Sequence, residues 1–213
     1  MKAIKIIVLF IILGLVCNAQ VNTIKDLNAL LAETKVNDKE KIERLAAKKF
    51  DKIISDYRKI NGKKHLYWSD TVWIAAKNHN NYMLERSNFT KTNTRVEIGH
   101  IEIKGCLNFT GETPKDRYLF SELKNNEDYI SCGENVLMGE LNSKKNVEEI
   151  STDIANLAFK QWKNSAIHNK NMLDCDYQYH AVAFTIVYNK NKVMYFGTDL
   201  FITKTLNNLY NGL

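Results

Sequence analysis

The chain has 213 residues and a formal net charge of +6; 25% of its residues are charged and 45% are hydrophobic. This length suits one ordinary domain with an N-terminal extension. The basic residues form only short pairs, such as Lys63-Lys64 and Lys144-Lys145, so we expect no nucleic-acid partner.

Residues 1–19 have the pattern of a secretory signal peptide. Two lysines precede an apolar run over residues 6–16, and small residues follow where a signal peptidase reads them, so cleavage is predicted after Ala19. The run is too short to span a membrane, and no later stretch has the ~20 apolar residues required. We therefore predict a secreted or periplasmic protein with no transmembrane segment after cleavage. The alternative is a lipoprotein acylated on Cys17, which Val16 disfavours because a small residue is expected there.

Three segments have the apolar spacing of amphipathic helices. The first begins at Asp38, which can cap it, and ends at Asn61-Gly62. The second follows Ser69-Asp70, and the third runs from about Val147 to Trp162.

Two strands are predicted at the end of the chain. Residues 179–188 and 193–202 are rich in β-branched and aromatic residues, and Asn189-Lys190-Asn191-Lys192 joins them as a hairpin. Residues 87–131 lose periodicity and contain the one proline of the chain, which predicts a long ordered loop region that carries function.

These elements predict an α+β domain over residues 38–213, in which helices pack over an antiparallel sheet. Residues 20–37, with a weak helical pattern, are predicted to form a loosely attached N-terminal arm.

Two histidines and two glutamates are the candidate functional residues. His100 and Glu102 lie in the 87–131 region, Glu134 lies in a Gly-Glu-Asn turn, and His168 follows the third helix. Imidazole nitrogen and carboxylate oxygen suit Zn²⁺ or a similar ion. An imidazole beside a carboxylate also suits general acid–base catalysis. The alternative is a buried polar network in which these side chains satisfy one another.

The other three histidines are expected to have no role in the site. His65 is predicted to lie at the surface, His79 to pack or hydrogen-bond within a helix, and His180 to be a structural residue of a strand.

No nucleophile in a recognised motif accompanies the candidates. Ser131, Ser165 and Cys132 are near the expected site, but none lies in a Gly-x-Ser-x-Gly elbow. The charge of Glu134 disfavours a Cys132 thiolate, so a cysteine hydrolase is the weaker hypothesis.

Three cysteines follow the predicted cleavage point: Cys106, Cys132 and Cys175. An oxidising compartment favours one bridge and leaves one thiol over. We expect Cys106 to pair with Cys132 because both flank the expected site, although spacing alone leaves the pairing open.

Several segments form a compound pattern that is far more specific than one short motif. They are Leu66-Tyr67-Trp68-Ser69, Ala75-Ala76-x-x-His79-x-x-Tyr82-Met83, His100-x-Glu102, Phe109-Thr110-Gly111-x-Thr113-Pro114-x-Asp116-Arg117, Gly133-Glu134-Asn135, Trp162-x-Asn164-Ser165-x-x-His168-x-x-Asn171-x-Leu173 and Tyr195-Phe196-Gly197-Thr198-Asp199-Leu200-Phe201. Over most of the mature chain they resemble the bacterial branch of the CAP superfamily, or SCP domain, named for cysteine-rich secretory proteins, antigen 5 and pathogenesis-related 1 proteins.

The resemblance implies an α-β-α sandwich whose central cavity is lined by two histidines and acidic residues and binds a divalent ion in some members. Carried over to this chain, the set is His100, Glu134 and His168, with Glu102 as a fourth member.

The chain departs from the family pattern at several points. Ala166 stands where proline is usual, Asn169 stands where arginine is usual, and the gap between Met83 and His100 is longer than usual. The cysteine-rich hinge of animal members is absent from the sequence.

The leading hypothesis is a secreted CAP-domain protein whose His/Glu cavity binds a divalent metal ion, such as Zn²⁺, and an extracellular protein or lipid. The first rival is a hydrolase in which Glu134 and His168 activate water, with or without an ion. The second is a scaffold whose loops bind a protein partner. A metal site or an enzyme requires His100, Glu134 and His168 to converge on an open cavity, whereas a scaffold allows them to be fully buried and mutually satisfied.

Overall fold

The structure is a computed structural model that describes residues 38–89, 99–122, 129–189 and 191–205. The predicted signal peptide and N-terminal arm lie outside the described residues, so both stay predictions. Residues up to Lys41 form a compact unit separate from the domain that begins at Ile42, and of that unit only residues 38–41, which are helical, are described.

The domain contains helices and strands in mixed order. The first helix spans residues 38–60, with residues 42–60 in the domain. It is followed by β1 (Tyr67–Trp68), α2 (Asp70–Phe89), α3 (Pro114–Glu122), β2 (Tyr129–Asn142), α4 (Val147–Lys163), α5 (Ala166–Leu173), β3 (Tyr179–Asn189) and β4 (Lys192–Thr205).

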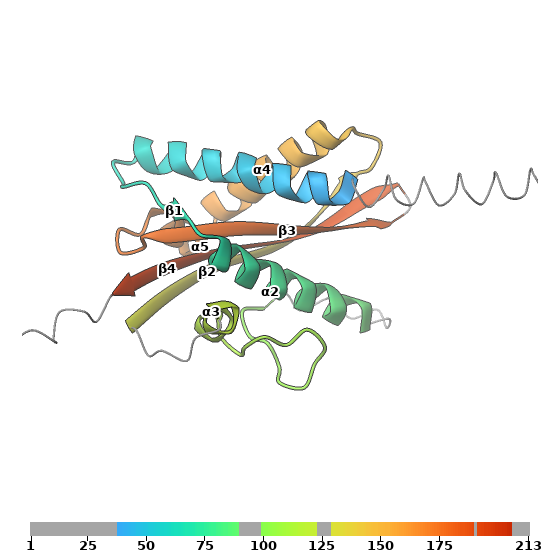
Figure 1. The fold of residues 1–213 in the computed structure, drawn as a ribbon. Coiled ribbons are helices and arrows are strands. Elements are labelled where there is room, and N and C mark those ends of the chain that lie inside the picture. Colours follow the sequence, from blue (N-terminus) through green and yellow to red (C-terminus); the bar gives the residue numbers. More distant parts are fainter. Residues whose placement is uncertain (1–37, 90–98, 123–128, 190, 206–213) are drawn as a thin grey trace, which may run out of the picture. The chain divides into compact units, whose positions relative to one another are not determined.

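Four strands form one sheet in the order β1-β3-β4-β2. β3 and β4 form the predicted antiparallel hairpin, β2 pairs antiparallel with β4, and β1 adds two residues parallel to β3. Residues 42–60 of the first helix and α4 cover one face of this sheet, and α2 and α3 cover the other (Figure 1). The predicted α+β fold and α-β-α sandwich are therefore confirmed.

The core on the first-helix side is built from large side chains. Phe50 meets Trp162 of α4 edge to face at 5.1 Å and Phe184 of β3 at 6.3 Å, and all three are buried. Asn146 starts α4 with a reciprocal capping box to Glu149, which satisfies backbone donors of the first turn. This layer holds α4 rigidly over the sheet.

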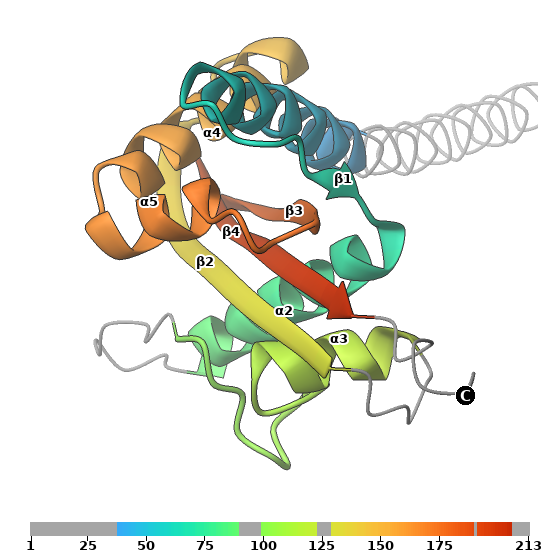
Figure 2. The same ribbon diagram turned by 90° about the vertical axis from the view of Figure 1, so that its left-hand side faces the viewer.

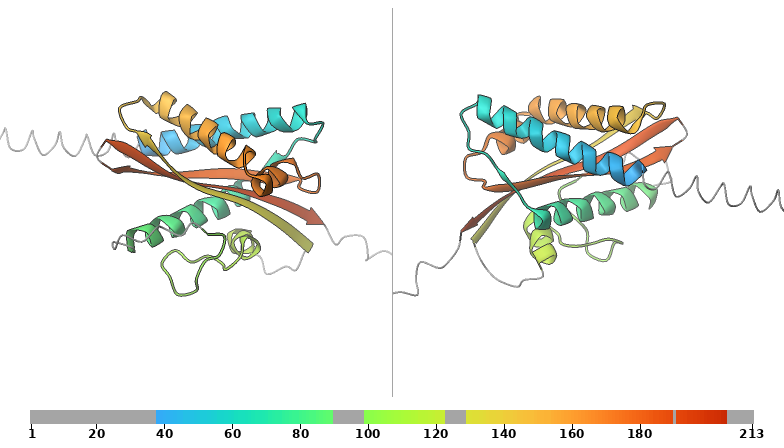
Figure 3. Two further views of the ribbon diagram at one scale, coloured as in Figure 1. Left: turned by 180° about the vertical axis from the view of Figure 1, so that it is seen from behind. Right: turned by 45° about the horizontal axis from the view of Figure 1, so that its top comes forward.

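α2 packs closely against the opposite face of the sheet because the side chains of β3 on that face are small. Ala181 and Ala183 of β3 face Val72, Ala75 and other residues of α2, whereas the alternate residues of β3 point to the other core. The period of two in β3 thus separates the two cores. Figure 3 shows residues 42–60 of the first helix and α4 on one side of the sheet and α2 on the other.

Two segments that were predicted as a loop and a turn prove to be regular structure. Residues 114–122 of the predicted loop region form α3, and the predicted Gly-Glu-Asn turn is part of β2, where Glu134 pairs with Leu200 of β4. Gly133 is needed in this strand because the Tyr177 ring covers it, and a Cβ there would lie 2.3 Å from the Tyr177 hydroxyl. The short strand β1 and helix α5 were likewise not predicted.

In the described part of the chain, no helix has the length and apolar character needed to cross a bilayer.

Candidate functional site

A network of charged side chains lies between β2 and the layer of α2 and α3. Its members are His79 of α2, His100 and Glu102 of the loop after α2, Arg117 of α3 and Glu134 of β2. His100 has a 47% exposed side chain, whereas the other four are at most 2% exposed. The network is therefore closed at its inner end and open to solvent at His100.

Glu134 is the centre of this network. Its Oε1 accepts a hydrogen bond from Nδ1 of His100 at 2.9 Å, and its Oε2 accepts one from Nη2 of Arg117 at 2.5 Å. Burial raises the pKa of Glu134, but the hydrogen bond from His100 and the charges of His79 and Arg117 bring that pKa below its ordinary value. Glu134 is therefore ionised at neutral pH, and His100 carries a proton on Nδ1.

Glu102 fixes the loop that carries His100. Its Oε1 accepts from Nδ1 of His79 at 2.9 Å, and its Oε2 accepts from the backbone N–H groups of Thr110 at 2.7 Å and Gly111 at 3.3 Å. Gly111 permits this approach because a Cβ there would lie 2.6 Å from the backbone of Arg117. Each oxygen of Glu102 is thus already used to hold the loop.

His79 and Arg117 are members of the site that the sequence analysis did not assign to it. Nδ1 and Nε2 of His79 both face oxygen acceptors, Glu102 and the carbonyl of Gly99, each at 2.9 Å, which only the imidazolium form satisfies fully. Arg117 also donates to the carbonyl of His100 at 3.1 Å. Both lie inside the segments that carry the CAP resemblance, and this position is the feature of the sequence from which their place in the site could have been predicted.

Two asparagines bring α5 and His168 to the edge of β2. Asn135 donates from Nδ2 to the carbonyl of His168 at 3.0 Å, and Asn171 donates to Oδ1 of Asn135 at 2.9 Å and to the carbonyl of Glu134 at 3.3 Å. These hydrogen bonds join the Gly-Glu-Asn motif to the His-x-x-Asn motif, so both motifs have a structural role. Figure 2 shows α5 beside β2 at this edge.

His168 differs from the network residues because its Nδ1 is buried without a hydrogen-bond partner among the described residues. Burial and the neighbouring charge of His100 lower the pKa of His168. His168 is therefore neutral at pH 7 and presents an unused ring nitrogen near His100.

The structure thus brings His100, Glu102 and Glu134 into one network, and it places His168 close enough to His100 for the charge of His100 to lower the pKa of His168. Across the described ranges, no three His, Cys, Asp or Glu side chains are arranged as a group that could hold a metal ion. The predicted four-residue ligand set is untested and stays a prediction.

The structure does not support Cys132, Ser131 or Ser165 as a nucleophile. Burial, together with the charge of Glu134, raises the pKa of Cys132 to about 12, although Lys115 and Arg117 oppose this shift. The Cys132 thiol is therefore protonated at neutral pH. Ser131 is exposed, and Ser165 begins α5 without making a side-chain cap.

The predicted bridge between Cys106 and Cys132 is not formed, since Cys106, Cys132 and Cys175 are all free thiols. Cys132 packs against the cluster of Val72 and its neighbours, whereas Cys106 packs against a separate cluster around Tyr82 and Met83. The two side chains flank the site, as expected, but they belong to different hydrophobic clusters.

The three-layer fold with its His/Glu network defines an α-β-α sandwich of the SCP type. The sequence model of the CAP family, described as the cysteine-rich secretory protein family, matches residues 52–200. This match covers more than half of the chain, and the chain therefore belongs to that family.

Solved structures of bacterial proteins are similar in fold. One is an extracellular protein containing an SCP domain from Bacillus anthracis str. Ames, with 19% identity and a TM-score of 0.49 over 76% of this chain and 41% of that chain. Another is an outer surface protein from Borrelia burgdorferi, with 18% identity and a TM-score of 0.48 over 75% of this chain and 93% of that chain.

A third is a cysteine-rich secretory protein from Staphylococcus aureus subsp. aureus, with 16% identity and a TM-score of 0.39 over 76% of this chain and 39% of that chain. The chain thus spans less than half the length of the first and third of these proteins. Comparison with curated proteins gives no match.

Proposed function

We propose that this chain is an extracellular CAP-domain binding protein that holds a divalent cation, such as Zn²⁺, on His100 and His168. The observation that carries this proposal is the buried Nδ1 of His168, which has no hydrogen-bond partner among the described residues. The lowered pKa of His168 keeps its ring neutral, and a neutral imidazole is the commonest metal ligand in proteins.

The setting of His100 supports the same role. Because its Nδ1 donates to Glu134, Nε2 is the ring nitrogen left to bind a cation, in a side chain that is 47% exposed. Metal-binding histidines characteristically donate their other nitrogen to a carboxylate, which fixes the tautomer and the ring orientation. A cation held there would supply a Lewis acid and would lower the pKa of a bound water.

In this proposal the two glutamates position ligands. The guanidinium of Arg117 lies 2.5 Å from Glu134 and 3.7 Å from Glu102, and its charge disfavours a dication on either carboxylate. This differs from the sequence-based set, in which Glu134 and Glu102 also bind the ion.

The loop beside the site also supports an apolar extracellular partner, protein or lipid. Ile101, Ile103 and Leu107 are between 52% and 60% exposed on the segment that carries His100. The predicted signal peptide supports an extracellular location. Binding to phosphatidylcholine vesicles that is lost in Ile103→Asp favours a lipid partner, and no binding favours a protein.

A scaffold is the second candidate because the four buried network side chains bond one another, as in a structural network, although Nε of Arg117 has no hydrogen-bond partner among the described residues. The two candidates are separated by a calorimetric zinc titration of the protein from Gln20 onward. All samples carry Cys175→Ser, since the exposed Cys175 thiol could bind zinc by itself.

We expect saturable one-site binding that is lost in the His100→Ala, His168→Ala double variant. His65→Ala is the matched control, because His65 is exposed and hydrogen-bonds only to Ser55 among the described residues. Absence of zinc binding, or binding unchanged in the double variant, would contradict the proposed cation site on His100 and His168 and would favour the scaffold.

A further inference from the structure

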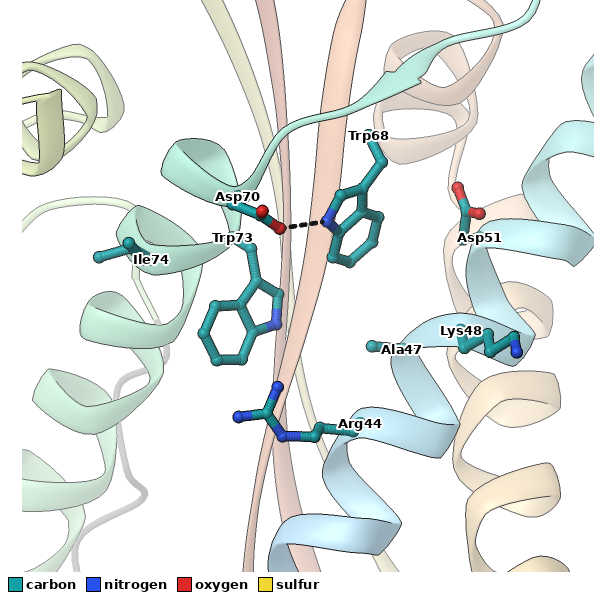
Figure 4. Close-up of a pocket in the computed structure, with 8 residues that line it drawn as sticks. All are labelled: Arg44, Ala47, Lys48, Asp51, Trp68, Asp70, Trp73 and Ile74. Carbon is teal, nitrogen blue, oxygen red and sulfur yellow. Dashed lines mark hydrogen bonds between the residues drawn. The ribbon is translucent and has the colours of Figure 1, made fainter.

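A groove lies at the edge of the sheet opposite to the His/Glu network. The network adjoins β2, and the groove adjoins β1 at the other end of the strand order. It has a volume of about 480 Å³ and lies between residues 42–60 of the first helix and the beginning of α2 (Figure 4). This volume is within the range of about 300–1,000 Å³ of small-molecule sites.

The groove does not suit an added peptide strand, although β3 is close to the sheet edge. β1 pairs only with the first two residues of β3. Farther along, Glu43 accepts from the backbone N–H of Ile186 at 2.9 Å, and Lys77 donates to the carbonyl of Phe184 at 3.1 Å. These side chains also pair with each other at 2.6 Å, so they occupy the edge that a peptide would need.

Two tryptophans form the walls of the groove, and both are held in place. The indole N–H of Trp68 donates to Oδ1 of Asp70 at 3.0 Å, and its ring meets His180 edge to face at 6.1 Å. The guanidinium of Arg44 lies 5.6 Å from the centre of the Trp73 ring. Both indoles turn toward the space between the two helices (Figure 4).

The charged side chains of the groove balance one another. Two are cationic, Arg44 and Lys48, and two are carboxylates, Asp51 and Asp70. The groove therefore offers both hydrogen-bond donors and acceptors without a net charge.

Asp51 is the most firmly positioned of these groups. Its Oδ1 binds Nε2 of His180 at 3.0 Å, and Nδ1 of the same buried ring binds Asp199 at 3.0 Å. Burial lowers the pKa of His180, but Asp199 and Asp51 outweigh this effect and raise it to about 9. The Asp51 side chain is 33% exposed, and its second oxygen binds no other described residue.

We propose that this groove binds a neutral saccharide, with the C–H face of a sugar ring against Trp68 or Trp73 and hydroxyl groups on Asp51, Asp70 and Arg44. Aromatic rings supply a large contact surface to such a face, and hydroxyls use donors and acceptors together. The balanced charge disfavours a strongly charged ligand.

The test uses the intrinsic fluorescence of the protein from Gln20 onward. Two of the three tryptophans line the groove, and the third, Trp162, is fully buried in the core. The ligands are N-acetylglucosamine, its trimer, cellotriose and tetramethylammonium chloride. We expect a saturable change of emission with at least one of the saccharides and none with tetramethylammonium.

The variants separate a specific site from a general effect. Trp68→Ala or Trp73→Ala, whichever removes the ring that contacts the sugar, should weaken saccharide binding at least about tenfold, and phenylalanine at that position should retain most of it. Phe120→Ala, which removes a 55% exposed ring from α3, should leave the affinity unchanged. Trimer binding tighter than monomer binding indicates a polysaccharide as the source of the ligand, and equal affinities indicate a single sugar ring.

Three outcomes overturn the proposal. They are the absence of a saturable change with every saccharide, a response to tetramethylammonium alone, and unaltered saccharide binding by folded Trp68→Ala and Trp73→Ala variants. The groove does not depend on the cation site, so the His100→Ala, His168→Ala variant should bind saccharide normally.

Discussion

Replacement of Arg117 by methionine tests whether one guanidinium holds the buried network together. Methionine retains most of the apolar volume of the side chain and removes its charge. Arg117 is 1% exposed, and it bonds the Glu134 carboxylate and the carbonyls of His100 and Glu112. The variant leaves Glu134 and Glu102 buried without this cation.

Breaking a buried ion pair by removing one partner costs about 3–5 kcal/mol of unfolding free energy. With a urea dependence of about 1–3 kcal/mol per molar, the midpoint of urea unfolding should fall by roughly 2 M. The assay is equilibrium urea denaturation at pH 7, followed by tryptophan fluorescence.

The control is Lys115→Met, an exposed position on the same helix, which should change the stability by no more than about 0.5 kcal/mol. Adding Glu134→Gln to Arg117→Met should recover part of the loss, because the amide removes the unpaired charge. A midpoint for Arg117→Met within the range of the control would refute this account of the network.

Three further predictions concern other parts of the domain. The pKa of His180 is about 9 in the folded protein against an ordinary 6.5, so protonated His180 stabilises the fold, and this contribution is complete below pH 6.5. The contribution, at most ~3 kcal/mol, should be lost as the pH rises through 9. A urea midpoint that does not change between about pH 6.5 and 9.5 would contradict this prediction. Gly133→Ala should lower the free energy of unfolding by about 1–3 kcal/mol, because the added Cβ meets the Tyr177 ring. In a Tyr177→Ala background the same substitution should have a smaller effect on the urea midpoint. A maleimide reagent at pH 7 should label the exposed Cys175 much faster than Cys132, whose pKa is raised to about 12, and equal labelling rates would show that Cys132 is not protected.

The helices and the hairpin could be predicted because burial on one side leaves a periodic pattern in the sequence. In α4, for example, Ile150, Ile154 and Ala158 recur at helical spacing, and all are fully or almost fully buried. α3 has only nine residues, and its two buried side chains are Arg117 and Tyr118, so it has no comparable apolar pattern.

β2 could not be predicted either, and the physical reason differs from that for α3. Glycine and asparagine are depleted in strands, so Gly133-Glu134-Asn135 has the local preference of a turn. Pairing with β4 and the Tyr177 ring over Gly133 override that preference.

Part of the candidate site followed from the family resemblance, which placed His100, Glu102 and Glu134 together. Arg117 could not be predicted from residue type, because most arginines are exposed and only a paired one is buried. Nδ1 of His168 has no hydrogen-bond partner in the part of the chain that the structure describes, and this depends on the packing of α5 against β2, which spacing alone does not specify.

The most direct test of the cation site is an anomalous diffraction experiment on crystals grown with zinc and measured at the zinc absorption edge. The account predicts one strong peak at about 2.0–2.1 Å from Nε2 of His100 and Nδ1 of His168, with Glu134 still bonded to His100. A peak on the carboxylates of Glu102 and Glu134, or no peak beside the two histidines, would contradict it.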